Sequence, residues 1–198
     1  MAEPTARRRL PRPASDRGPR VTSRRVTGAG DDLPVERVLI LLRHGKSDYP
    51  GGVADHQRPL APRGRREAAL AGSAIRERVT VTQVMCSTAT RTRETLAATG
   101  IDAPVTYTDA IYEASTGEIL QVLTALPGDP EVVLVVGHSP GMPATALALA
   151  DPESDPTALA DVEARFPTSA FAVLRVHGSW ADLATEGATL AELVIPRA

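Results

Sequence analysis

The chain has 198 residues, a hydrophobic content of 42%, a charged content of 23% and a formal net charge of −2. These values are ordinary for a one-domain globular protein, and no apolar run approaches the roughly 20 residues that a membrane helix needs. The single cysteine, Cys86, excludes a disulfide framework within the chain and a cysteine-based metal site. A single cysteine fits a reducing compartment, so we expect a cytoplasmic protein without membrane contact.

Residues 1–34 differ in composition from the rest of the chain. Eight arginines, four prolines and only two acidic residues precede residue 26. Because few large apolar residues are present, the segment cannot offset its ordering entropy, and we predict a disordered tail. The tail is either a solvated segment or the product of a start codon placed too far upstream. The alternative is a basic arm that contacts nucleic acid or an acidic surface. One folded domain is then predicted over residues 35–198.

Strands and helices alternate along the predicted domain. Residues 46–61 are expected to form a loop, and residues 151–168 a long loop around one possible short helix. Because the strands lack a polar face, this order indicates an α/β layer fold with a mainly parallel sheet. The predicted strands are 33–42, 79–86, 105–107, 132–136, 169–176 and 190–195, and the predicted helices are 63–78, 88–99, 115–126 and 141–150.

The first strand ends abruptly in two polar residues. Five apolar residues, 38–42, are followed by Arg43, His44 and Gly45. Histidine can act as a nucleophile at neutral pH, and arginine offers a fork of donors that matches phosphate oxygens. The three-residue pattern alone is equally compatible with a histidine that caps the strand beside a solvated arginine.

A second apolar strand, 132–136, shows the same pattern, because Gly137 and His138 follow it directly. Since sites in open parallel sheets form outside the carboxyl ends of the strands, both histidines can share one site. Arg91, in the first turn of the helix after the second strand, and Arg58, in the loop after the first strand, can reach the same place. Such a set of histidines and arginines suits phosphate.

Five sequence pieces stand out between about residue 36 and the C-terminus: residues 41–47 (LLRHGKS), 58–60 (RPL) followed by Gly64, 87–95 (STATRTRET), 111–114 (IYEA) and 136–141 (VGHSPG). Together, and in this order, they resemble the histidine phosphatase superfamily, the phosphoglycerate-mutase-like fold, and most closely its SixA-type phosphohistidine phosphatases. The resemblance implies a three-layer α/β fold with a mostly parallel central sheet flanked by helices.

The resemblance also implies a role for each matching residue. His44 would be the nucleophile and would carry the phosphoryl group, while Arg43, Arg58 and Arg91 would hold the phosphoryl oxygens. His138 would complete the site and stabilise charge in the transition state. Phosphoryl transfer needs mainly positioning and neutralisation of negative charge, which cationic groups supply. We therefore expect no metal and no cofactor.

The proton donor stays open at this point. Glu113 falls where relatives place an acid, and it is either a general acid or only a loop carboxylate. Asp48 is a weaker candidate, because loop aspartates usually serve turns. The other polar candidates are expected in structural roles: His56 and His177 at the surface, and Ser87 and Thr95 in packing or at a helix end.

The sequence therefore predicts a phosphatase that forms a phosphohistidine on His44, with a phosphohistidine protein as the preferred substrate. The absence of a long insertion between Gly100 and Val132 predicts an open site, which suits a protein substrate better than an enclosed sugar phosphate. A small-molecule phosphomonoesterase acting on a phosphorylated metabolite is the nearest alternative, and a mutase fits less well. A non-catalytic phosphate-binding module is the alternative of another class. The low aromatic content, 3%, argues against nucleic-acid binding by the folded part.

Overall fold

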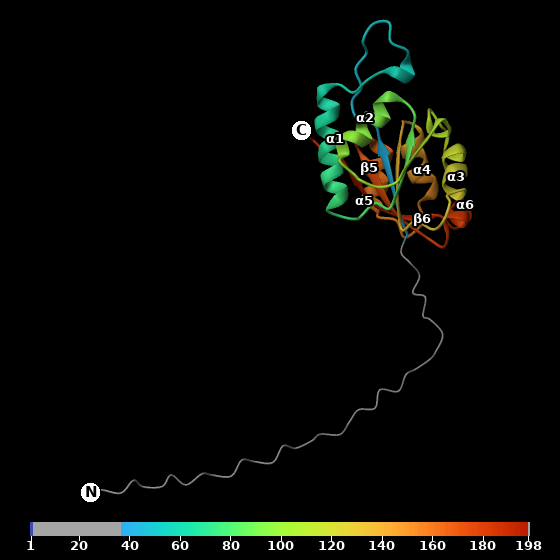
Figure 1. Ribbon diagram of the computed structural model, residues 1–198. Coiled ribbons are helices and arrows are strands. Elements are labelled where there is room, and N and C mark those ends of the chain that lie inside the picture. Colours follow the sequence, from blue (N-terminus) through green and yellow to red (C-terminus); the bar gives the residue numbers. More distant parts are fainter. Residues whose placement is uncertain (2–36, 198) are drawn as a thin grey trace. The chain divides into compact units, whose positions relative to one another are not determined.

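The computed structural model describes Met1 and residues 37–197, of which residues 37–197 belong to a compact unit, Leu33–Ala198 (Figure 1). The predicted tail, residues 1–34, lies outside the described residues apart from Met1, so its proposed disorder stays a prediction. No helix among the described residues combines the length and the apolar character needed to cross a bilayer.

The described residues form one sheet with the strand order β3-β2-β4-β1-β5-β6. The pairs β1–β4, β2–β4 and β2–β3 are parallel, whereas β5 runs antiparallel to both β1 and β6. The prediction of a mostly parallel sheet is therefore confirmed. The strands are β1 Arg37–Arg43, β2 Gln83–Ser87, β3 Val105–Thr108, β4 Val132–Gly137, β5 Phe171–Val176 and β6 Ala188–Val194.

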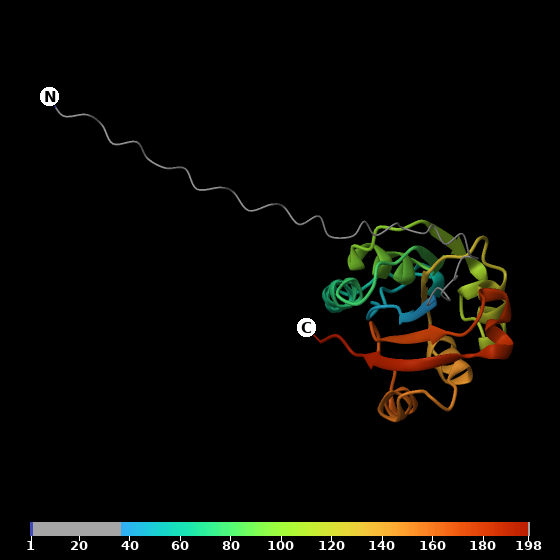
Figure 2. The same ribbon diagram turned by 90° about the horizontal axis from the view of Figure 1, so that it is seen from below.

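Helices cover both faces of this sheet, and Figure 2 shows α1 and α2 on one side and α5 on the other. Alternation along β1 explains the layering, because successive side chains of a strand point to opposite faces. Leu39 and Leu41 pack with residues of α3 to α6, whereas Ile40 and Leu42 pack with residues of α1 and α2. The helices are α1 Pro62–Arg76, α2 Thr90–Thr99, α3 Thr116–Thr124, α4 Gly141–Leu149, α5 Pro156–Ala164 and α6 Leu183–Glu186.

Local sequence signals account for several helix ends. The predicted capping box at the start of α3 is present, with the Ser115 and Glu118 side chains each bonded to the other's backbone N–H. Gly100 ends α2 in the left-handed region at φ 63°, where glycine carries no steric penalty. Three 3-10 turns (Asp55–Gln57, Asp109–Ile111 and Trp180–Asp182) and α6 were not predicted, because single turns of three or four residues carry no periodic signal.

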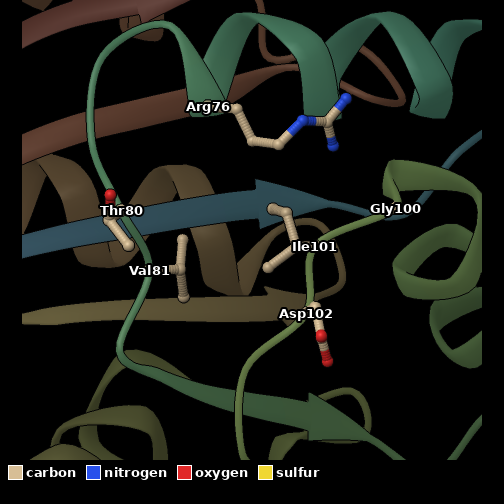
Figure 3. A pocket seen from close by; sticks show the side chains of 6 residues that line it. All are labelled: Arg76, Thr80, Val81, Gly100, Ile101 and Asp102. Atoms are coloured by element: carbon tan, nitrogen blue, oxygen red, sulfur yellow. The ribbon is translucent and has the colours of Figure 1, made fainter.

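A cavity of about 330 Å³ lies between the end of α1 and the loop that joins α2 to β3 (Figure 3). It is at the amino-terminal side of β2 and β3, away from the strand ends that carry the histidines. Arg76 already donates to the Thr99 carbonyl there, so the cavity offers no buried unpaired cation for a ligand. Its lining residues are Arg76, Thr80, Val81, Gly100, Ile101 and Asp102.

Candidate active site

Two parallel strands place the two histidines at the same edge of the sheet. Arg43, the last residue of β1, lies opposite Gly137, the last residue of β4, so His44 and His138 directly follow the two strand ends. The backbone N–H of His44 donates to the Gly137 carbonyl at 3.0 Å, and the two imidazole centroids are 5.2 Å apart. Residues separated by 94 positions therefore form one site through strand register alone.

The His44 ring has a defined orientation. Its Nδ1 lies 2.7 Å from the Gly45 carbonyl oxygen, which can only accept, so Nδ1 carries the hydrogen and Nε2 keeps its lone pair. Burial is the main reason that the pKa of His44 is lowered to about 4. The hydrogen bond to Gly45 raises this pKa, and the charges of three nearby arginines lower it. His44 is therefore a neutral imidazole at pH 7, with Nε2 available as a nucleophile.

His138 is almost completely buried, with 4% of its surface exposed. Its Nε2 shares a hydrogen bond of 2.9 Å with the Ser87 hydroxyl, while its buried Nδ1 has no partner among the described residues. Burial, and next the nearby His44, lower the pKa of His138 to about 3. A buried ring nitrogen without a partner is costly, which makes Nδ1 a candidate contact for a ligand.

Three arginines approach the histidines from different elements: β1, the β1–α1 loop and α2. Arg43 donates from Nη1 to the Phe166 carbonyl at 2.7 Å, and its buried Nε has no partner among residues 37–197. Arg58 and Arg91 are also buried, at 9% and 4% exposure. A guanidinium has five N–H donors, and each of the three makes fewer bonds than that, so donors remain for an anion.

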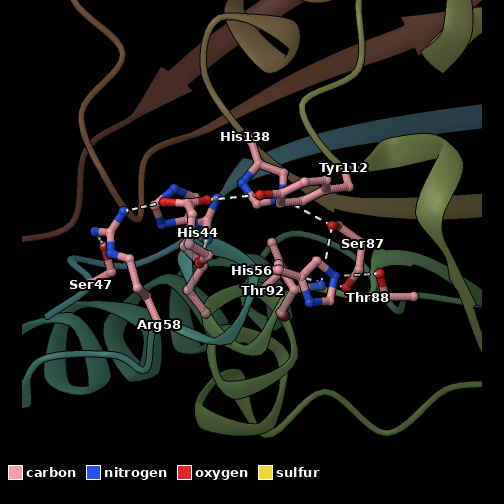
Figure 4. A network of polar contacts seen from close by, with 12 residues as sticks. His44, Ser47, His56, Arg58, Ser87, Thr88, Thr92, Tyr112 and His138 are labelled. Carbon is pink, nitrogen blue, oxygen red and sulfur yellow. Dashed lines mark hydrogen bonds and ion pairs between the residues drawn. The ribbon is translucent and has the colours of Figure 1, made fainter. Parts of the chain in front are cut away.

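Asp55 joins two of these arginines, and Figure 4 shows the surrounding polar network. Its Oδ1 accepts from Arg58 at 2.7 Å, and its Oδ2 lies 3.0 Å from Arg91 Nη2 and accepts from the Tyr112 hydroxyl at 2.8 Å. The hydrogen bond from Arg58 is the largest of the contacts that lower the pKa of Asp55 to about 2. The carboxylate is therefore ionised at pH 7 and cannot serve as the proton donor.

Sequence reasoning missed Asp55 and also Tyr112 as site residues. Asp55 lies in a loop rich in Gly, Asp and Pro, where an aspartate normally indicates a turn. Tyr112 packs edge-on against the rings of His138 and His56, with centroids 5.4 and 4.8 Å away. A signal was available, because Asp55 precedes Arg58 by three residues and Tyr112 falls within the 111–114 piece of the resemblance.

His56 is half-exposed, with 41% of its side chain accessible, as the surface prediction expected. It is nevertheless part of the network, because its Nε2 shares a hydrogen bond of 2.9 Å with the Thr88 hydroxyl and its ring contacts Tyr112. Ser87 likewise does more than pack, since it contacts His138. These contacts were not predictable from residue type alone.

Two glycines allow the nucleophile segment to lie against the start of α1. A Cβ on Gly45 would be 2.8 Å from the Gly64 carbonyl oxygen, and one on Gly64 would be 2.2 Å from the Lys46 carbonyl oxygen. Only glycine fits both positions without a backbone shift. The Gly45 N–H also donates to the Thr95 hydroxyl at 2.9 Å, which fixes the segment against α2.

Glu113 directly follows Tyr112, and its backbone has a positive φ of 52°, a conformation rare for a residue with a side chain. The side chain is exposed and makes no hydrogen bond or ion pair with any residue that the structure describes. The structure therefore brings His44, His138 and the three arginines together and leaves Glu113 at the rim. The Asp48 carboxylate accepts the Tyr49 N–H at 2.9 Å.

Comparison with known proteins agrees with this geometry. The sequence profile of the histidine phosphatase superfamily (branch 1) matches residues 39–126. An uncharacterized protein of Mycobacterium tuberculosis (strain ATCC 25618 / H37Rv) is 48% identical over 158 residues, which cover 79% of this chain and 100% of the relative.

A solved structure from Nakamurella multipartitia, provisionally named phosphohistidine phosphatase SixA, is 45% identical, covers 82% of this chain and 97% of that chain, and superposes with a TM-score of 0.75. The chain belongs to the histidine phosphatase superfamily. A second SixA structure, from Agrobacterium tumefaciens and also provisionally named, is 29% identical, with coverages of 81% and 99% and a TM-score of 0.67. The resemblance of the sequence to SixA-type histidine phosphatases is thus confirmed.

Proposed function

We propose that this histidine phosphatase removes the phosphoryl group from phosphohistidine on a protein, through a covalent intermediate on Nε2 of His44. The observation that carries the proposal is a partly buried, neutral imidazole whose Nε2 has no partner among the described residues, beside three arginines with unused donors. The likeness to the SixA protein of Nakamurella multipartitia supports phosphohistidine as the substrate class.

The proposed reaction has two displacements at phosphorus. In the first, Nε2 of His44 forms a bond to phosphorus while the P–N bond of the substrate breaks, and the released imidazole takes up a proton. In the second, water attacks the phosphoryl group on His44, and inorganic phosphate and the neutral imidazole are released. Each displacement spreads negative charge over the equatorial oxygens, so positioned cations supply most of the catalysis.

Arg43, Arg58 and Arg91 would hold those oxygens, and His138 would donate to one of them as charge develops. Because three guanidinium groups already supply positive charge, the proposed mechanism uses no metal and no cofactor. The cytoplasm stays the predicted location, and a phosphorylated protein the predicted partner.

Glu113 is the remaining candidate for the proton donor to the leaving group. A phosphohistidine has a better leaving group than an alkyl phosphomonoester and needs less protonation. We therefore expect Glu113→Gln to lower kcat on a phosphomonoester by about tenfold or more and to change kcat on phosphohistidine by less than about threefold. Equal losses on both substrates would show that Glu113 has a structural role only.

Steady-state assays with a chemically phosphorylated histidine protein and with a panel of small phosphomonoesters test the proposed substrate. The proposal predicts that kcat/KM is highest for the phosphohistidine protein, and that His44→Ala abolishes turnover of every substrate. Efficient turnover of a sugar phosphate or nucleotide alone would instead identify a small-molecule phosphomonoesterase. Phosphate binding without any turnover would identify a binding module.

A further inference from the structure

Asp55 carries a negative charge inside a site that otherwise gathers positive charge. Its side chain is 47% exposed, and its two oxygens contact Arg58, Arg91 and the Tyr112 hydroxyl. A carboxylate that binds two guanidinium groups occupies donors that a phosphate dianion would otherwise use. Its presence beside the expected phosphate position therefore needs an explanation.

Placement of the arginines does not depend on this carboxylate alone. Arg58 also donates from Nε to the Asp48 carbonyl at 3.1 Å and from Nη2 to the Ser47 hydroxyl. Arg91 donates from Nη1 to the backbone carbonyl of Asp55 at 2.7 Å, a contact that any residue at position 55 would keep. The Asp55 side chain therefore adds its negative charge to these arginines and an acceptor for the Tyr112 hydroxyl.

The charge of the site supports this interpretation. Three guanidinium charges, less the one carboxylate charge of Asp55, leave two positive charges when both histidines are neutral. A phosphoryl group carries about −1.5 to −2 charges at pH 7, so the site with Asp55 balances it. Without Asp55 the site would hold a third, unbalanced positive charge and would bind substrate and product phosphate alike more tightly, which does not accelerate the reaction.

We propose that Asp55 is a positioning residue that acts through Arg58 and Arg91 to limit the affinity of the site for phosphate, so that the product leaves quickly. The inference rests on the proposed function, because inorganic phosphate is the product of that reaction. It predicts that removing the charge strengthens binding and slows turnover, whereas the loss of a purely structural residue weakens binding.

The test is Asp55→Asn, which keeps the shape of the side chain and removes its charge. Isothermal titration with inorganic phosphate should show about tenfold tighter binding than in the wild type, because one nearby opposing charge is gone. With the preferred substrate, KM and the inhibition constant for phosphate should fall together, and kcat should fall as release becomes rate-limiting. Thermal unfolding verifies that the half-exposed substitution leaves the protein folded.

Asp48→Asn is the matched control, because it removes one negative charge from the same loop. The Asp48 carboxylate accepts only from the Tyr49 N–H, at 2.9 Å, among its side-chain hydrogen bonds in the described part of the chain. Phosphate affinity should change by less than about twofold in this variant. Asp55→Glu keeps the charge, and it should retain the phosphate affinity of the wild type.

Weaker or unchanged phosphate binding in folded Asp55→Asn would overturn the inference, and so would a rise in KM. An equal increase in phosphate affinity in Asp48→Asn would overturn it as well, because the effect of the charge would then not act through the arginines. The phosphate titration needs no turnover. If the wild type hydrolyses no donor, the proposed function fails separately, while the titration still decides whether Asp55 limits phosphate affinity.

Discussion

Histidines lie at both ends of the central sheet, and their surroundings are opposite. At the carboxyl ends of β1 and β4, His138 is buried and His44 is partly buried beside arginines, and neither ring forms a hydrogen bond or ion pair with a carboxylate among the described residues. At the far end, His177 follows β5, is 41% exposed, and its Nε2 lies 2.6 Å from Asp151 Oδ2. The first environment lowers the pKa of both imidazoles, mainly through burial, whereas the second places a carboxylate against the ring.

This difference teaches that residue type alone does not identify the site. The His177 ring already has a hydrogen-bond partner within the protein, the Asp151 carboxylate. A histidine that is desolvated among cations keeps its lone pair for a ligand. The proposed function assigns chemistry only to the second environment, and the following predictions test that assignment.

The largest effect is expected for His44→Ala, which removes the proposed nucleophile. The variant should lose about 10⁴-fold or more in kcat/KM, because the covalent route is closed. His177→Ala is the matched control from the other end of the sheet, and its kcat/KM should stay within about twofold of the wild type. Equal losses in steady-state assays of the two variants would contradict the distinction between the ends.

A smaller loss is expected for His138→Ala. The proposed role of His138 is to stabilise charge that develops in the transition state, and removal of one such donor costs about 10²–10³-fold in kcat. KM should change much less than kcat. A variant that loses affinity for substrate but keeps kcat would show that His138 binds the ground state instead.

Ser87→Ala should lower kcat by about tenfold, because Ser87 positions the ring of His138 through a hydrogen bond of 2.9 Å. It should also destabilise the protein by about 1–3 kcal/mol, since Nε2 of a buried ring loses its partner. Ser154→Ala is the control: Ser154 is buried and bonded to Asp151 at the other end. It should lose stability without losing activity, as measured by denaturant unfolding and kcat.

The depressed pKa values of His44 and His138, about 4 and about 3, predict the smallest effect at neutral pH. In unfolded chains histidine titrates near 6.5, so unfolding takes up protons below that pH. The stability that this linkage gives is fully present above pH 6.5 and falls as the pH is lowered toward 4, by about 1.4 kcal/mol per pH unit and histidine. The free energy of unfolding of the double variant His44→Ala/His138→Ala, measured with denaturant between pH 4 and 7, should depend less steeply on pH than that of the wild type. An identical dependence on pH would refute the assignment.

The positions of His44, His138 and Arg91 could be predicted from the sequence, because they depend on where the strands end. Apolar runs that stop at Arg43 and at Gly137 indicate buried strands, and parallel pairing then requires His44 and His138 to meet. The helix that carries Arg91 follows from its position after β2. These parts are set by hydrophobic pattern and chain order, which a single sequence displays directly.

The rest of the site depends on contacts between loops, and loop sequences lack the hydrophobic periodicity from which helices and strands are predicted. Asp55, Tyr112 and His56 converge from the β1–α1 loop and the segment after β3, and no spacing rule predicts their distances. The role of Glu113 stays a prediction, because its place in a motif does not fix the direction of an exposed side chain. The antiparallel pairing of β5 with β1 was likewise not evident from composition.

The most direct test of the central claim is intact mass spectrometry of the full chain after brief reaction with acetyl phosphate and a quench that avoids acid. The account predicts an adduct with the mass of one phosphoryl group in the wild type, labile in acid and absent in His44→Ala. An adduct that persists in His44→Ala would contradict it. So would a wild type that forms no adduct and hydrolyses no donor.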